Sequence, residues 1–329
     1  MRSLQLFLPY PVPFAAHKRE ALSGLPALSK ILARGRATAL GVRPWETALL
    51  EAFGVARQRD WPLAPLSWLG EGGEGAEGYW LHADPVHLRA ERDALLLLDA
   101  RHFALEADPA RALVDALNTH FTPGGVRFFA PAPTRWYVRV DRVPNISTWP
   151  LRAAAGRSID ALLPYGSEAL AWHRMVNELQ MLLHAHAVNE MRESAGLPAI
   201  NSVWFWGGGV LPAVASGRFI GVWGDDPLAR GLAHAARLPC APLPDGADQW
   251  LAQSEAGKHV ILLALPEVQS REALLAAEQL WFAPLVRALK RRQLSALTLV
   301  AEDGGTAARF ELRAADLWKF WRRTPLQAE

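Results

Sequence analysis

The feature that most constrains the fold is a series of short apolar runs in the second half of the chain. They read SVWFW at 202–206, FIGVWG at 219–224, HVILLAL at 259–265 and ALTLVAE at 296–302. Helix-like segments at about 227–237, 271–291 and 314–322 separate or follow them. The runs lack strict alternation, so we expect strands buried on both faces in a largely parallel sheet. LQLFL at 4–8 predicts another short buried strand.

A second group of strand-like runs, mixed with a helix-like segment, lies between residue 79 and about residue 140. They read WLHADPVHL, ALLLLDA, GVRFFA and RWYVRV, with a helix-like segment, PARALVDALNTHF, among them. This mixture predicts a small α+β subdomain with its own sheet. The Gly/Glu-rich segment 70–78 before it is typical of an exposed loop. We therefore expect an α/β domain in two parts, 1–78 and 166–329, with an α+β subdomain inserted at 79–165.

Two further stretches have helical periodicity. One runs from residue 27 to about residue 53, with an interruption at Gly41 and Pro44. The other, at about 168–194, has leucines and a methionine along one side and Gly196 as its stop. Both predict helices that pack against the sheet layers.

The charge balance and the cysteine count limit the classes of function. Of the 329 residues, 35 are basic and 33 are acidic, which gives a formal net charge of +2. This balance argues against nucleic acid or an anionic membrane as a general partner. A single cysteine, Cys240, favours a reducing compartment. The sequence shows neither a signal-peptide pattern nor a membrane-spanning apolar stretch, so we expect a cytoplasmic protein.

The string HAHAVNEMRESAGLPAINSVWFWGGG at 184–209 resembles the archaeal-type cofactor-independent phosphoglycerate mutases of the alkaline phosphatase superfamily. The residues that carry the resemblance are His186, Val188, Asn189, Arg192, Gly196, Pro198, Ala199, Asn201, Gly207 and Gly209. Ala187 stands where the family has proline. The strings WPLAPL, ADPVHLRAERD and NSVWFWGGG also resemble bacterial RpfE-type proteins. The resemblance implies a three-layer α/β/α sandwich of alkaline-phosphatase type, with a mixed, largely parallel sheet.

The resemblance also implies two divalent metals and a serine that takes up the phosphoryl group. Where the first strand should end in a metal-binding Asp, this chain has Pro9. The nucleophile position falls near Thr47, which is also a plausible first-turn helix residue. Where later strands should lead into Asp and His, the chain has Glu267 and Asp303, and Asp303 is equally typical of an Asp-Gly turn. We therefore expect that the catalytic metal site is missing and that no cofactor binds, with Mn, Mg or Zn needed only if the protein is an active enzyme.

A residual pocket for an anion is the second candidate site. Three consecutive glycines after a predicted strand let backbone N–H groups approach a phosphate or carboxylate closely. The resemblance places an arginine clamp and two asparagines beside them. The candidate ligand-binding residues are Asn189, Arg192, Asn201, Gly207, Gly208 and Gly209. The alternative is a tight turn with helix caps and internal hydrogen bonds.

Two groups of histidines are candidate metal ligands. His82 and His87 flank Asp84, and His184 and His186 form an H-x-H pair. Positions i and i+2 of a helix point about 200° apart, so that pair chelates only where a helix has ended. A structural zinc needs four compact ligands, which neither group supplies. We predict no metal site in either group.

Three functions stay open at this point. The leading expectation is a catalytically degenerate mutase-like protein that acts as a regulatory or ligand-binding module. The second is an active metal-dependent phosphoglycerate mutase or phosphatase that uses Thr47, Glu267, Asp303 and atypical ligands. The third is a protein-interaction scaffold with an exposed patch near Trp318, Phe320 and Trp321, for which the alternative is a final helix docked on the core.

Overall fold

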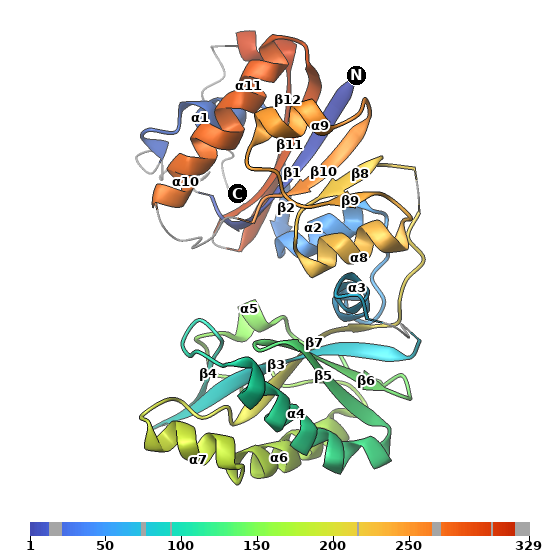
Figure 1. Ribbon diagram of the computed structural model, residues 1–329, viewed down its shortest axis with the longest axis vertical. Coiled ribbons are helices and arrows are strands. Elements are labelled where there is room, and N and C mark those ends of the chain that lie inside the picture. Colours follow the sequence, from blue (N-terminus) through green and yellow to red (C-terminus); the bar gives the residue numbers. More distant parts are fainter. Residues whose placement is uncertain are drawn as a thin grey trace. The chain divides into compact units, whose positions relative to one another are not determined.

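The computed structural model describes residues 1–12, 22–73, 77–92, 94–215, 217–264, 271–303 and 305–319. Contacts divide the chain into two compact units, which Figure 1 shows. Unit 1 comprises Met1–Val55 and Ala213–Glu329, and unit 2 comprises Ala56–Pro212. Unit 2 therefore interrupts unit 1 in the sequence. Its boundaries differ from those of the insertion predicted at 79–165.

Within the described residues, unit 1 is built on a seven-stranded mixed sheet in the order β2-β12-β11-β1-β10-β8-β9. The strands are β1 (Arg2–Pro11), β2 (Arg36–Val42), β8 (Gly221–Trp223), β9 (Cys240–Ala241), β10 (Lys258–Leu262), β11 (Leu294–Asp303) and β12 (Thr306–Arg313). Neighbours from β11 to β9 are parallel, whereas β12 is antiparallel to both β11 and β2. The largely parallel sheet that the apolar runs predicted is confirmed.

Helices cover both faces of this sheet (Figure 1). They are α1 (Pro26–Arg34), α2 (Trp45–Ala52), α8 (Pro227–Ala235), α9 (Ala247–Gln253), α10 (Arg271–Ala277), a π-helical turn η3 (Glu278–Phe282), α11 (Ala283–Lys290) and a 3₁₀ helix η4 (Ala314–Trp318). Leu4, Leu6 and Leu8 of β1 join a core with α1, α9 and α11, while Phe7 on the opposite face is also fully buried. α2 packs on β1 and β11, and α8 packs on β8. Unit 1 thus has the α/β layers predicted from the sequence.

In the part of the chain that is described, unit 2 contains a five-stranded sheet of β3 (Tyr79–Glu91), β4 (Ala94–Leu98), β5 (Val126–Ala132), β6 (Arg135–Val140) and β7 (Ser202–Gly209). The path runs β4-β3-β6-β5, and β7 pairs with β3. Its helices are α3 (Leu63–Gly70), α4 (Ala107–Phe121), the 3₁₀ turn η2 (Thr122–Gly124), α5 (Leu151–Ala154), α6 (Ala169–His184) and α7 (Ala187–Ser194). α4 and α6 share one apolar core with Trp136, Val138 and Phe205 of the sheet.

Strand β7 corrects the expectation for residues 202–209. The sequence predicts a strand of the parallel sheet followed by a glycine turn, but Ser202–Gly209 is one strand that runs antiparallel to β3 in unit 2. β7 is buried because α3, α5 and α6 contact it in addition to β3. An all-apolar run indicates burial on both faces, and burial alone does not determine which sheet the strand joins.

Three helical expectations are corrected as well. The segment 27–53 contains β2 between α1 and α2, because β12 supplies hydrogen-bond partners to residues 36–42. The segment 168–194 divides into α6 and α7, because His186 caps the second helix by accepting a hydrogen bond from the Val188 amide. Of the segment 314–322, residues 314–318 form the short helix η4, and residues beyond 319 lie outside the described part. In the described ranges, no helix has both the length and the apolar composition that crossing a bilayer requires.

Candidate functional site

The carboxyl ends of β1 and β11 form the place where the resemblance predicts catalysis. Pro11 pairs with Glu302, and the Val12 amide donates to the Glu302 carbonyl at 2.7 Å. Half-buried Pro9 is one of the last three residues of β1, which read PYP, so this strand offers no carboxylate there. The neighbouring strand instead ends in two buried acids, Glu302 and Asp303.

Thr47 lies in the first turn of α2, which packs on the same two strands. Its side chain is buried, and its amide donates to the Pro44 carbonyl at 3.2 Å, as in an ordinary helix start. The Arg43 amide donates to the Gly305 carbonyl at 3.1 Å, which holds the beginning of α2 beside the turn between β11 and β12. The structure therefore brings the segment of Thr47 and that of Asp303 to the same end of the sheet.

Glu46 is a buried acid of this end that sequence reasoning passed over. It belongs to the first turn of α2, whose other buried residues are mostly apolar. A carboxylate among apolar residues of one short helix was the signal in the sequence that could have identified Glu46, because acids are almost never fully buried unless they have a partner. The third catalytic candidate, Glu267, lies outside the described residues.

The acids at this end do not form a recognisable metal centre. Among the described residues, no three His, Cys, Asp or Glu side chains gather in a way that could hold a metal ion. A two-metal phosphoryl-transfer site needs several such ligands around each cation. The described residues therefore do not fit the pair of metals that the resemblance implies.

Asn189, the first of the predicted ligand-binding residues, is used inside unit 2. Its side-chain amide donates to the carbonyls of Leu183 (2.7 Å) and Ile200 (2.9 Å), and its Oδ1 accepts from the Ile200 amide at 2.8 Å. Only 1% of Asn189 is exposed. These contacts tie the end of α6 to the segment that leads into β7.

Arg192 and Asn201 also bond internally, but Arg192 keeps an unused donor. Asn201 exchanges two hydrogen bonds with the backbone of Leu88 in β3, at 2.7 and 2.9 Å. Arg192 Nε donates to the Pro198 carbonyl at 2.8 Å, and its guanidinium lies 6.0 Å from the centre of the Phe103 ring. Its buried Nη2 has no hydrogen-bond partner in the described structure, and burial lowers the pKa of the guanidinium.

The three glycines lie in β7 where neighbouring groups approach the backbone closely. A Cβ on Gly208 would come within 2.5 Å of the Tyr79 hydroxyl, and one on Gly209 within 2.6 Å of Pro62 Cβ. Gly207 has a φ of +66°, which side chains rarely adopt. Close packing against β3 and the start of α3 is therefore sufficient to explain the glycine run.

His82 of β3 belongs to a buried network of aromatic rings. His82 stacks on Trp206 with ring centres 4.3 Å apart. Asp84 accepts hydrogen bonds from the Trp136 amide (3.0 Å) and from Trp206 Nε1 (2.8 Å). Burial lowers the pKa of His82 to about 3 and raises that of Asp84 to about 7, because it disfavours the charged form of both side chains. His87 bonds separately to the Ala199 carbonyl at 2.7 Å.

The layered, mostly parallel sheet of unit 1 and the smaller sheet of unit 2 define an α/β protein. The chain matches no family model and no curated protein. It is similar to the solved structure of the PH0037 protein from Pyrococcus horikoshii, with 13% identity, a TM-score of 0.56, and coverage of 94% of this chain and 87% of the other. It is also similar to a cofactor-independent phosphoglycerate mutase from Thermoplasma acidophilum, with 15% identity, a TM-score of 0.46, and coverage of 94% and 90%. The similarity to PH0037 supports the fold.

Proposed function

We propose that this chain is a catalytically degenerate phosphoglycerate-mutase-like protein that acts as a regulatory or ligand-binding module. The observation that carries the proposal is Pro9 at the end of β1, where the resemblance calls for a metal-binding carboxylate. The side chain of proline offers no ligand to a cation. Thr47, at the nucleophile position, is buried in an ordinary first helical turn, which agrees with a structural role.

The ligand-binding part of the proposal is supported by Arg192. A buried guanidinium whose Nη2 lacks an acceptor costs free energy unless an anion or water completes its hydrogen bonds. A small phosphorylated or carboxylate ligand would supply such an acceptor. The reducing cytoplasm is the compartment we propose, because the single cysteine, Cys240, is an exposed free thiol.

The test measures bound Mn, Mg and Zn together with phosphoglycerate mutase and phosphatase turnover. We expect less than one metal per chain and no turnover in the natural protein, in Thr47→Ala and in the conservative control Thr47→Ser. Stoichiometric metal together with turnover that Thr47→Ala abolishes and Thr47→Ser retains would refute the degenerate assignment.

One observation favours the alternative that the protein is an active enzyme. Glu302 and Asp303 are buried acids at the end of β11, and the beginning of α2, which carries Glu46 and Thr47, lies beside them. Oxygen ligands of this type suit Mg or Mn. If these acids bind metal, Asp303→Asn must lower both the metal content and the turnover.

The scaffold alternative is favoured by Trp318, which is 80% exposed. The helix η4 does pack on the apolar core, but through Leu317, so the Trp318 ring stays exposed beside it. Phe320 and Trp321 lie outside the described residues. A protein partner that is retained by the natural chain and lost on Trp318→Ala, with the stability unchanged, would support this function.

A further inference from the structure

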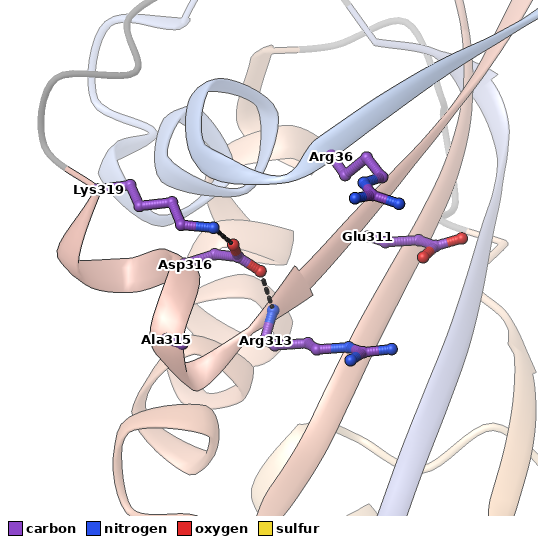
Figure 2. A pocket seen from close by; sticks show the side chains of 6 residues that line it. All are labelled: Arg36, Glu311, Arg313, Ala315, Asp316 and Lys319. Atoms are coloured by element: carbon purple, nitrogen blue, oxygen red, sulfur yellow. Dashed lines mark hydrogen bonds and ion pairs between the residues drawn. The ribbon is translucent and has the colours of Figure 1, made fainter.

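A cavity of about 320 Å³ lies in unit 1 at the end of β12, where the chain turns into η4 (Figure 2). It is lined by Arg36, Glu311, Arg313, Ala315, Asp316 and Lys319. Arg313 pairs with Ala296 near the start of β11, whereas Asp303 lies at the other end of the same strand. Seven residues of strand separate these levels by about 24 Å. The cavity is therefore distinct from the site at the carboxyl ends of the strands.

The cross-strand register places three charged side chains of the cavity on one face of the sheet. Arg36 of β2 lies directly opposite Glu311 of β12, and Arg313 follows two residues later. Opposite residues and residues two apart share a face. Phe310 and Leu312 point to the other face, into the apolar core. Figure 2 shows the side chains of Arg36, Glu311 and Arg313 extending in the same direction.

The two acids of the cavity already have cationic partners. Asp316 forms an ion pair with Lys319 and accepts a hydrogen bond from the Arg313 amide at 3.0 Å. Glu311 forms an ion pair with Arg309, with Glu311 Oε1 3.4 Å from Arg309 Nε. Among the described residues, neither the Arg36 guanidinium nor the Arg313 guanidinium has a carboxylate or carbonyl acceptor. The cavity thus contains two arginine side chains with unused donors.

From these charges we infer that the cavity binds the oxyanion group of a small molecule, a phosphate or carboxylate held by Arg36 and Arg313. Guanidinium groups match the geometry of both oxyanions. Glu311, between the two arginines in the register, selects a ligand that also carries a hydrogen-bond donor such as an amine. The volume is at the lower end of the roughly 300–1,000 Å³ of small-molecule sites, so we expect a small metabolite. This inference is independent of the proposed function.

Titration of the whole chain with inorganic phosphate at constant ionic strength, followed by calorimetry, tests the two arginines. We expect one phosphate per chain and binding at least about 10-fold weaker in Arg36→Gln and in Arg313→Gln, because each loses a charged hydrogen bond. Arg291→Gln, which removes an exposed arginine outside the cavity, is the matched control and should bind like the natural chain. Acetate titrated in parallel distinguishes a phosphate site from a carboxylate site.

Two further measurements predict tighter binding and so do not depend on a loss of binding. Glu311→Gln removes a like charge and should bind phosphate several-fold more tightly than the natural chain. Phosphoethanolamine, whose ammonium group can meet Glu311, should bind the natural chain more tightly than phosphate does and should lose this advantage in Glu311→Gln. The proposal is overturned if neither oxyanion binds, or if the arginine variants and Arg291→Gln bind phosphate equally well.

Discussion

Replacing Asn189 with alanine tests whether this residue has a structural role or is available to a ligand. The side chain connects three backbone groups, the carbonyls of Leu183 and Ile200 and the amide of Ile200, through hydrogen bonds of 2.7 to 2.9 Å. With 1% of Asn189 exposed, water has no direct access to these groups. Alanine would remove this partner from all three groups; the Leu183 carbonyl would keep the His186 amide at 3.2 Å, whereas the amide and the carbonyl of Ile200 would stay buried without a donor or acceptor.

The expected loss of stability follows from the number of hydrogen bonds that the substitution removes. Each hydrogen bond contributes about 1 kcal/mol net, and a buried group left without a partner costs about 1–3 kcal/mol. Asn189→Ala should therefore lower the free energy of unfolding by roughly 3–5 kcal/mol. This is a large share of the roughly 5–15 kcal/mol that stabilises a typical protein.

Urea unfolding followed by tryptophan fluorescence and by circular dichroism measures this loss. Asn177→Ala is the matched control, because Asn177 is exposed on the neighbouring helix α6 and should change stability by no more than about 0.5 kcal/mol. A loss below about 1 kcal/mol for Asn189→Ala would refute the reasoning. The amide would then not be committed to the backbone, and a ligand-binding role would regain support.

Three further predictions concern single side chains. Burial raises the pKa of Asp84 from 3.8 to about 7, so the folded state holds a proton that the unfolded state releases, and stability should fall as the pH rises from about 4 to 7. The fall is at most about 4 kcal/mol. Urea unfolding across this pH range should show the fall in the natural chain and not in Asp84→Asn, and parallel pH curves for the two proteins would contradict the prediction. Gly208→Ala should lower the melting temperature, since the new methyl group would meet the Tyr79 hydroxyl, and an unchanged value would show that β7 adjusts easily. Leu317→Ala should cost about 2–5 kcal/mol in urea unfolding and Trp318→Ala less than about 0.5 kcal/mol, because the leucine is in the core and the tryptophan is exposed; equal losses would contradict this assignment.

Burial was easier to predict from the sequence than pairing. The runs that became β1, β8, β10 and β11 are apolar enough that burial on both faces was the simplest interpretation. Strands β2 and β12 were missed because RATALGV and TAARFELR are rich in alanine and leucine, which favour helices, and only their pairing with each other and with β11 makes them strands. β7 was recognised as a strand and placed in the wrong sheet, since its partner β3 is far away in the sequence.

The candidate sites show the same limit. The resemblance was the signal that assigned Thr47 and Asp303 to one site, and the structure places the start of α2 beside the end of β11. The bonds that Asn189 and Asn201 make with Ile200 and Leu88 had no such signal, because helix caps, internal clamps and ligand contacts use the same amide group. Arg36 and Arg313 were not foreseen either, because their proximity depends on the register of two strands that were themselves missed.

The interruption of unit 1 by unit 2 has a consequence for synthesis. β1, the central strand, is synthesised before the other strands, yet Ser3 pairs with Lys258 and Ala296, which are synthesised more than 250 residues later. Unit 2 has all of its strands once Gly209 emerges. At about 10 residues per second, roughly 10 s separate that point from the emergence of β12. During this interval the apolar residues of β1 have no partner strands, so the nascent chain should need protection at β1 while unit 2 is already folding.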